Sequence, residues 1–233
     1  MIHFYDFFVN PEGENHPLAG KDVTRPFKTI NYALSQAQNS INWSPMLKLA
    51  DGIYDEAITT IDGAIIEGNV ANPNNVVVLS SNKSNQVLLT KGYLNLKGVK
   101  IKATHNQNNA IEVNCFPSYL NLSHSIIECC DIRKNSHLNI VLGGTVYVKD
   151  TIFKGYAKEV FKVQYGSYCH ISTGNIFRAP TLVLKPIIRA NNCSRVFITN
   201  KGIKVLGPTN LREHFEVDST SEFNGPKEIL KWE

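Results

Sequence analysis

A short apolar-x-apolar motif recurs at a nearly constant interval and limits what this chain can fold into more than any other feature. One series of five copies consists of Leu94-Asn95-Leu96, Leu120-Asn121-Leu122, Val146-Tyr147-Val148, Cys169-His170-Ile171 and Val196-Phe197-Ile198. A second, interleaved series consists of Ile111-Glu112-Val113, Leu138-Asn139-Ile140, Phe161-Lys162-Val163, Ile188-Arg189-Ala190 and Phe215-Glu216-Val217. A third contains Ile126, Ile152, Ile176 and Ile203. Three series with a common step of about 25 residues predict a solenoid.

Each triplet has the two-residue period of a β-strand, in which the flanking apolar residues point inward and the middle residue points outward. The segment between a triplet of the second series and the next triplet of the first is almost constant in length, which predicts a fixed corner. Each turn therefore carries about three short strands. We predict an all-β fold, a single-stranded parallel β-helix of about seven turns, and infer its right-handed sense from the general preference of parallel connections.

A helix is expected close to the N-terminus. Thr24 can cap it and Pro26 suits its first turn. Apolar residues follow at helical spacing up to about Gln38, namely Phe27, Ile30, Ala33, Leu34 and Ala37. Because the end of a solenoid exposes apolar side chains, we expect this helix to cap it. The chain then divides into an N-terminal strand, loop and capping α-helix (1–45), a parallel β-helix (46–223) and a C-terminal tail (224–233), within one structural domain.

Composition excludes several classes of function. The net charge of +4 is small and scattered, so no nucleic-acid partner is expected. The N-terminus lacks a basic region followed by an apolar core, and no segment reaches the roughly 20 apolar residues of a membrane span. The five cysteines are odd in number, which favours free thiols in a protein that folds in a reducing cytoplasm. They form no C-x-x-C pair, so no metal site is expected. No cofactor is expected.

Two N-terminal segments resemble the pectin-lyase-like right-handed β-helix superfamily. The first is Phe8-Val9-Asn10 with the later Arg25-Pro26-Phe27-Lys28-Thr29-Ile30, and the second runs from Leu47 to Glu56. With the repeats, the resemblance covers nearly the whole chain, and it extends to the β-helices of phage tail spikes, tail fibres and baseplates. It implies the fold more than the function, because this fold is used by lyases, hydrolases, esterases and non-catalytic phage proteins.

The sequence offers little of the chemistry that enzymes of this superfamily need. Glycan hydrolysis requires two carboxylates held close together, and the chain contains no Asp-Asp pair. The outward column of the second series has acids only at its two ends, Glu112 and Glu216. A neighbouring column is rich in amides and is expected to form a ladder of side-chain hydrogen bonds: Asn114, Val141, Gln164, Asn191 and Asp218. The segment Tyr54-Asp55-Glu56 resembles the start of pectin methylesterases, but no downstream Gln-Asp or Asp-containing motif matches theirs, so an esterase is not expected.

One polar cluster remains as a weak catalytic candidate. It consists of His124, Glu128, Asp131 and Arg133, with Asp150 one turn beyond His124. A His-Asp pair on adjacent strands, about 4.8 Å apart, could transfer protons. The alternative is that these are solvated corner residues.

Three aromatic side chains form an expected outward stripe on successive turns: Tyr147, His170 and Phe197. Exposed aromatic rings can contact sugars or form a subunit interface, and ordinary packing under a loop is the alternative.

These observations favour a non-catalytic component of a phage tail that contacts a receptor or glycan. We expect a homotrimer that binds other virion proteins and cell-surface polysaccharide, located in the virion after synthesis in the host cytoplasm. The main alternative is a polysaccharide depolymerase, a hydrolase or lyase, with a site formed between subunits. A secreted enzyme acting on plant polymers, and hence an extracellular location, is the third hypothesis.

Overall fold

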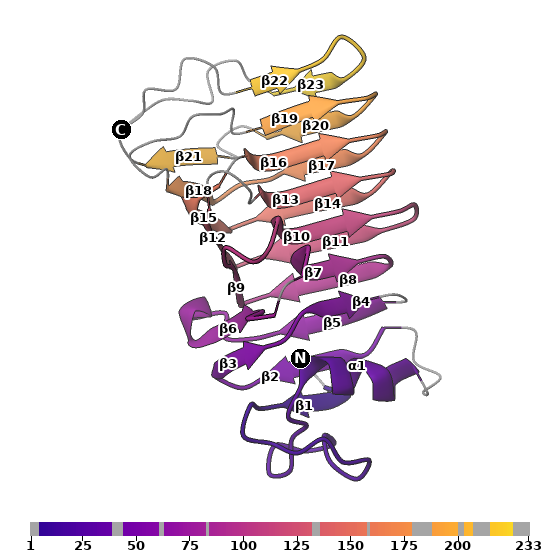
Figure 1. The fold of residues 1–233 in the computed structure, drawn as a ribbon, viewed down its shortest axis with the longest axis vertical. Coiled ribbons are helices and arrows are strands. Elements are labelled where there is room, and N and C mark those ends of the chain that lie inside the picture. Colours follow the sequence, from indigo (N-terminus) through magenta and orange to yellow (C-terminus); the bar gives the residue numbers. More distant parts are fainter. Residues whose placement is uncertain are drawn as a thin grey trace.

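The structure is a computed structural model that describes residues 5–38, 44–60, 63–82, 84–131, 136–157, 159–178, 188–199, 203–206 and 215–225. Its strands form three parallel sheets that wind around a common axis (Figure 1). Sheet A contains β1 (Phe7–Val9), β2 (Met46–Leu49), β5 (Gly63–Glu67), β8 (Tyr93–Lys97), β11 (Tyr119–Ser123), β14 (Thr145–Lys149), β17 (Tyr168–Ile171), β20 (Arg195–Ile198) and β23 (Glu222–Asn224). Sheet B contains β3 (Gly52–Asp55), β6 (Val76–Leu79), β9 (Lys100–Ala103), β12 (Ile126–Cys130), β15 (Ile152–Tyr156), β18 (Asn175–Arg178) and β21 (Ile203–Leu206). Sheet C contains β4 (Ile58–Thr60), β7 (Gln86–Thr90), β10 (Asn109–Asn114), β13 (Ser136–Val141), β16 (Glu159–Gln164), β19 (Ile188–Asn191) and β22 (Phe215–Val217). A short 3-10 helix, Pro73–Asn75, precedes β6.

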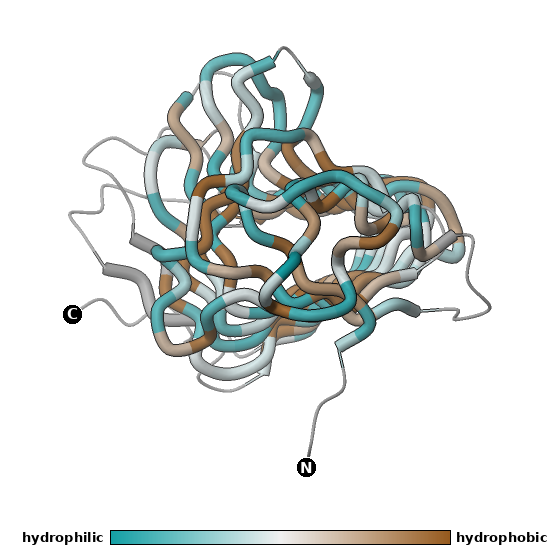
Figure 2. Tube along the Cα trace, turned by 90° about the horizontal axis from the view of Figure 1, so that it is seen from below, coloured by the Kyte–Doolittle hydropathy of each residue, from teal (hydrophilic) through white to brown (hydrophobic). Residues whose placement is uncertain are grey.

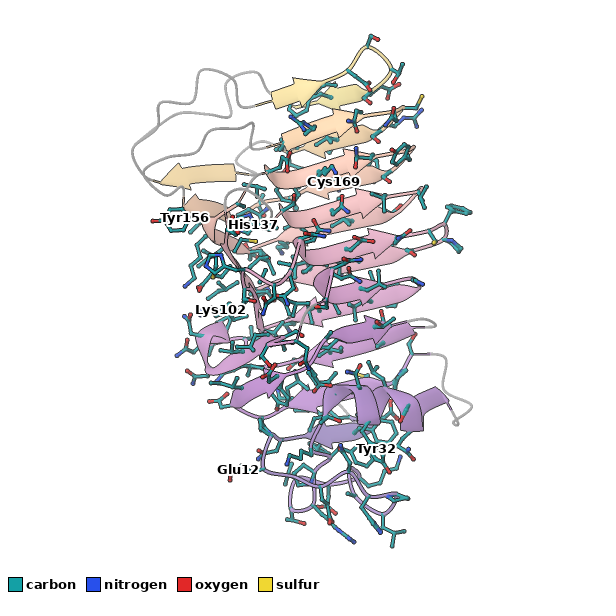
Figure 3. All side chains as sticks on the ribbon, viewed as in Figure 1. Glu12, Tyr32, Lys102, His137, Tyr156 and Cys169 are labelled. Carbon is teal, nitrogen blue, oxygen red and sulfur yellow. The ribbon has the colours of Figure 1, made fainter. Side chains whose placement is uncertain are left out.

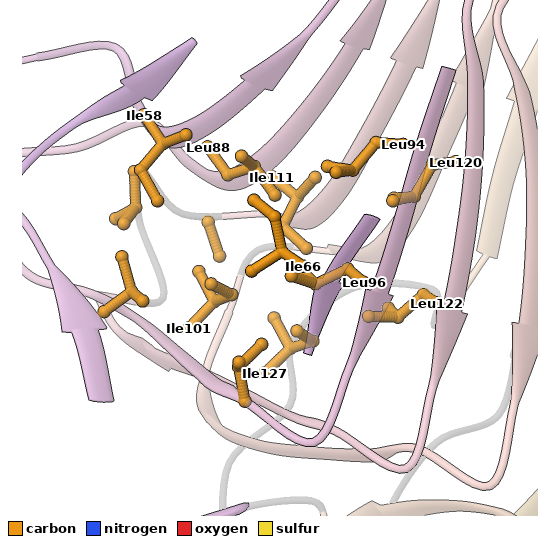
Figure 4. Packing of buried hydrophobic residues seen from close by; sticks show 14 of the residues in the cluster. Ile58, Ile66, Leu88, Leu94, Leu96, Ile101, Ile111, Leu120, Leu122 and Ile127 are labelled. Atoms are coloured by element: carbon orange, nitrogen blue, oxygen red, sulfur yellow. The ribbon is translucent and has the colours of Figure 1, made fainter. Parts of the chain in front are cut away.

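The register of the strands follows the repeats of the sequence. Leu94 pairs with Leu120 and Leu120 with Val146, as the first series requires. Their side chains point inward, and together with other aliphatic side chains they fill the centre of the solenoid (Figure 4). Viewed along the axis, hydrophobic and hydrophilic segments alternate around each turn (Figure 2). The prediction of an all-β parallel solenoid with three sheets and little helix is confirmed.

The third series is confirmed in part, because Ile126 pairs with Ile152 and Ile152 with Ile176. On sheet B the fully buried, inward side chains are Ile101, Ile127 and Phe153, so Ile126 and Ile152 of the series lie on the outer side of their strands. The register also slips at its last step, because Ile203 pairs with Asn175 and not with Ile176.

The structure describes only part of the expected number of turns. About five turns, from β2 to β16, are described with short gaps, and beyond β18 the connections between strands fall partly outside the described residues. The count of seven turns and the right-handed sense therefore stay predictions. Most of the expected tail, 224–233, also lies outside the described residues.

The N-terminal helix, α1 (Ile30–Gln38), begins later than predicted. Thr29, not Thr24, caps it, because the backbone N–H of Tyr32 donates to Thr29 Oγ1 at 3.2 Å. Two further N–H groups, those of Ile30 and Asn31, donate to the carboxylate of Glu56 at 2.7 and 2.9 Å. The apolar face of α1 is buried in the same cluster as β1. Its role as a cap stays a prediction.

Candidate functional site

The structure brings together the His-Asp pair that the sequence indicated, at the corner between sheets A and B. His124 Nε2 lies 3.7 Å from Asp150 Oδ2, which is beyond hydrogen-bonding distance, and both side chains are partly exposed. Both residues have positive φ, 48° and 47°. The carboxylate of Asp150 lies directly against Gly174 of the next corner, where a Cβ atom would collide with it. This pair occupies stacked corners of the solenoid.

Glu128 lies on the outer face of sheet B, separated from the His-Asp pair. Lys100 Nζ and Lys154 Nζ are 2.8 and 3.1 Å from its carboxylate, and Lys102 Nζ is 3.8 Å away. Burial alone would raise the pKa of Glu128, but the hydrogen bonds from Lys100 and Lys154 outweigh this effect and lower the pKa. Such a carboxylate stays ionised at neutral pH and cannot act as a general acid.

Asp131 follows β12 and lies 3.3 Å from Nδ1 of His105. Arg133, the remaining member of the expected cluster, lies outside the described residues. The side chains that were close in sequence therefore belong to separate places: a corner, the face of sheet B and the end of a strand. No single acid/base site is assembled from them among the described residues.

The outer face of sheet C holds the amides and acids of the second series. Glu112 accepts hydrogen bonds from the side-chain amides of Asn109, Asn114 and Asn139, at 3.1, 3.0 and 3.2 Å. The expected amide ladder is not formed among the described residues, because Asn114 donates to Glu112 of its own strand and Asn191 Oδ1 is buried without a partner. Glu112 is thus held by three donors.

Glu159, a fully buried acid that the sequence analysis missed, begins the strand β16 of the same sheet. Its side chain is 1% exposed, lies 3.2 Å from Arg189 Nη1 and accepts a hydrogen bond from Ser136 Oγ at 3.0 Å. This ion pair could not be predicted from the repeats, because Glu159 precedes the apolar triplet of its strand and Arg189 comes from the next turn. Neither Glu112 nor Glu159 is an open carboxylate, and glycan hydrolysis would need two.

The expected aromatic side chains do lie next to one another on the outer face of sheet A. The register pairs Tyr147 with His170 and His170 with Phe197. Their ring centroids are 5.3 and 4.9 Å apart, and both contacts are edge-to-face.

Three further tyrosines extend this row, and the sequence analysis missed them because they occupy the first position of their strands. Tyr93 stacks on Tyr119 at 5.3 Å, Tyr119 lies 5.2 Å from Tyr147, and Tyr147 lies 6.0 Å from Tyr168. We call the six rings of Tyr93, Tyr119, Tyr147, Tyr168, His170 and Phe197 the aromatic stripe. It crosses β8, β11, β14, β17 and β20 without a break, along the axis of the solenoid.

The stripe presents both ring surface and polar groups. The rings of Tyr93 and Tyr119 are stacked and nearly parallel, with 16° between their planes, so each covers one face of the other. The residue before Tyr93 in the same column is Gly63, which has no side chain, and Tyr93 is 39% exposed. The outward amides of Asn95 and Asn121 lie in the column beside these tyrosines. Burial lowers the pKa of His170, so this ring is neutral at neutral pH.

The described residues contain neither a cluster of metal ligands nor a helix that could span a membrane. No group of three or more His, Cys, Asp or Glu side chains in this part of the chain could hold a metal ion. Equally, none of the helices described is long and apolar enough to cross a membrane.

Comparison with known proteins shows the fold but not a family. No family model and no curated relative match the sequence. Among solved structures, Escherichia coli YbhC is 12% identical with a TM-score of 0.54, over 88% of this chain and 73% of that one. The pectin methylesterase from Aspergillus niger in a penultimately deglycosylated form is 11% identical with a TM-score of 0.52, over 100% of this chain and 89% of that one. Its deglycosylated form gives 11% and 0.51 over the same shares.

These similarities place the chain with pectin-lyase-like β-helices at the level of fold. A resemblance to phage tail spikes is not shown by them.

Proposed function

We propose that this protein is a non-catalytic β-solenoid that binds a glycan chain along the aromatic stripe of sheet A. The observation that carries this proposal is the unbroken row of six rings across β8 to β20. A row that follows the axis of a rod suits a linear ligand lying along it. The fold neighbours include proteins named after a carbohydrate polymer, which supports a carbohydrate-related role.

The chemistry of the stripe suits a sugar. Aromatic rings pack against the C–H faces of sugar rings, and tyrosine hydroxyls and side-chain amides hydrogen-bond to sugar hydroxyls. Tyr93 is the best platform, because Tyr119 covers one face of its ring and its partner on the preceding strand is Gly63, which has no side chain. Asn95 and Asn121 supply amides beside it.

Catalysis is disfavoured because the three acids described above are already engaged. Glu112 accepts three amide hydrogen bonds, Glu128 is surrounded by three lysines and Glu159 is buried against Arg189. A depolymerase with a site between subunits is the alternative, and it would be recognised by the release of reducing or unsaturated sugar.

Calorimetry with homogalacturonan, cello- and chitin-oligosaccharides tests this proposal. We expect one of these probes to bind, and Tyr93→Ala and Tyr147→Ala to weaken its binding by up to about tenfold each, the value of one aromatic contact. Tyr156→Ala is the matched control, since Tyr156 is an exposed tyrosine on sheet B, on the opposite side of the molecule from the loops between sheets C and A (Figure 3). No binding by any probe, or equal losses in all three variants, would contradict the proposal.

The biological setting stays as the sequence predicts it. We expect a phage-tail component made in the host cytoplasm, with other virion proteins as neighbours and an extracellular glycan as its contact. A right-handed solenoid of seven turns, closed at its N-terminal end by α1, is the body we infer for it. Light scattering would distinguish the homotrimer that the sequence led us to expect from a monomer or a dimer.

A further inference from the structure

One edge of the solenoid carries large apolar side chains at backbone positions that do not favour them. This edge consists of the corners that join each strand of sheet C to the next strand of sheet A, on the right in Figure 1. The corners stack directly: Gly143 N–H donates to the carbonyl of Tyr165 at 3.1 Å, and Gly166 N–H to the carbonyl of Asn192 at 2.9 Å. We call Phe116, Leu142 and Tyr165, which lie on three successive corners, the corner ridge.

The side chains of the corner ridge project into solvent. Phe116 is 82% exposed, Leu142 53% and Tyr165 54%. Phe116 extends along the edge to the following corner, where a Cβ on Gly143 would lie 3.2 Å from Phe116 Cβ. Consecutive corners are separated by the strand spacing of about 4.8 Å, so the three side chains form a continuous strip.

Folding alone does not account for Leu142 and Tyr165. Each begins a pair of residues with positive φ, Leu142-Gly143 at 54° and 82° and Tyr165-Gly166 at 57° and 71°. Two successive residues with positive φ favour Asn-Gly, because bulky side chains are strained there by about 1 kcal/mol or more. The next corner has Asn192 at the same place, with φ 57°. The chain thus places exposed leucine and tyrosine where asparagine would be more stable, which indicates a contact made outside the monomer.

The strip fits a second copy of the same edge. A row of side chains repeating at the strand spacing is matched by another surface with that spacing, and this edge is such a surface. The charged residues at the two ends of this edge favour one relative orientation of the two copies. Lys91 lies in the corner before Phe116, and Asp218 lies in the corner beyond Asn192. Arg195 and Glu222 nearby pair with each other at 3.1 Å and cancel.

An antiparallel arrangement places Lys91 of one copy beside Asp218 of the other, whereas a parallel one would bring like charges together. The centre of symmetry then falls between Leu142 and Tyr165, so that each leucine meets the partner's tyrosine. This is an isologous two-fold contact. In place of the homotrimer expected from the sequence, we propose that two copies of this chain associate side by side and antiparallel through the corner ridge. Because the strip is narrow, we expect the dimer to be weak and reversible.

Sedimentation velocity over a series of concentrations tests the association. The wild type should pass from monomer to dimer, and Leu142→Asn with Tyr165→Asn should stay monomeric over the whole series. Asparagine suits both positions, so the double variant should keep or exceed the melting temperature of the wild type, which separates loss of the contact from loss of the fold. Leu18→Asn, at an exposed leucine in the N-terminal loop, is the matched control and should dimerise normally. A monomeric wild type, a trimer, or a dimer that survives the double substitution would overturn the proposal.

Two exposed free cysteines on the same edge report the orientation. Cys115 precedes Phe116 and Cys193 follows Asn192. In a Cys130→Ser background we would treat Cys115→Ser, Cys193→Ser and an equal mixture of the two with a short bismaleimide. Antiparallel pairing brings Cys115 of one copy to Cys193 of the other, so only the mixture should cross-link. Cross-linking of either single variant with itself would show parallel pairing and overturn the proposal.

Discussion

His137 is a buried histidine in β13 of sheet C. It is 2% exposed, and its Nε2 lies 2.8 Å from the carbonyl oxygen of Lys154. Nδ1 has no hydrogen-bond partner among the described residues, and the imidazole ring makes a T-shaped contact with Phe153, with ring centroids 5.7 Å apart. Nε2 therefore carries the proton of a neutral imidazole. Burial lowers the pKa of His137 to about 4.

We predict that this histidine makes the fold sensitive to acid. In the unfolded chain its pKa is about 6.5, so between pH 6.5 and 4 the unfolded state binds a proton that the folded state does not. The contribution to stability is complete above pH 6.5 and falls with decreasing pH, by about 3 kcal/mol down to pH 4. Urea denaturation at several pH values should show this slope in the wild type and a shallower one in His137→Gln. Exposed His16→Gln is the control, and equal slopes in all three proteins would contradict the assignment.

Single residues were predictable where the repeat fixed their place. His124 and Asp150 meet because they occupy equivalent corners, and Tyr147, His170 and Phe197 meet because each is the middle of a triplet. Glu128 and Asp131 do not form a site with His124, because Glu128 pairs with lysines and Asp131 with His105 of neighbouring turns. A single sequence does not reveal which long side chains cross from one turn to the next.

Gly155 in β15 shows how tightly two turns approach at the level of one element. Its φ is +85°, and a Cβ there would collide with the carbonyl oxygen of Cys129 in β12. The strand thus tolerates no side chain at this position. Gly166 has a similar φ of +71°, but nothing lies within 4 Å of its Cβ position.

These two glycines separate backbone strain from steric overlap. Gly166→Ala should cost about 1 kcal/mol, the strain of a positive φ alone. Gly155→Ala should cost that strain plus the displacement of β12, and we expect roughly 3 kcal/mol or more in total. The free energy of unfolding of both variants, measured in urea, gives the difference directly. Equal costs would mean that β15 can move away from β12 without penalty.

Element boundaries were predictable in the regular array and less so at the N-terminus. The strands follow the apolar repeat because inward positions must match from turn to turn. The helix began at Ile30 instead of near Pro26, because Phe27 is buried beside Phe7 and its backbone hydrogen-bonds to Phe8 and Asn10 of the first strand. The tertiary contacts of Phe27 therefore outweighed the local preference of Thr24 and Pro26 for the start of a helix.

At the scale of the whole molecule, the three sheets give the rod three different surfaces. Sheet C holds acids that are already engaged, sheet B gathers lysines around Glu128, and sheet A carries the aromatic stripe. The sequence was sufficient for an all-β parallel solenoid with three sheets, since period two and a step of about 25 residues leave few alternatives. It was insufficient for the function, because this fold supports many activities and the outer side chains decide among them.

Footprinting of tyrosines tests directly whether the glycan lies along sheet A. The protein would be treated with tetranitromethane with and without the oligosaccharide that binds best in calorimetry, and the nitration rate of each tyrosine measured by mass spectrometry. We predict that the sugar slows nitration of Tyr93, Tyr119, Tyr147 and Tyr168 and leaves Tyr156 unchanged. Protection of Tyr156 without protection of the stripe, or unchanged rates at all five tyrosines, would contradict the account.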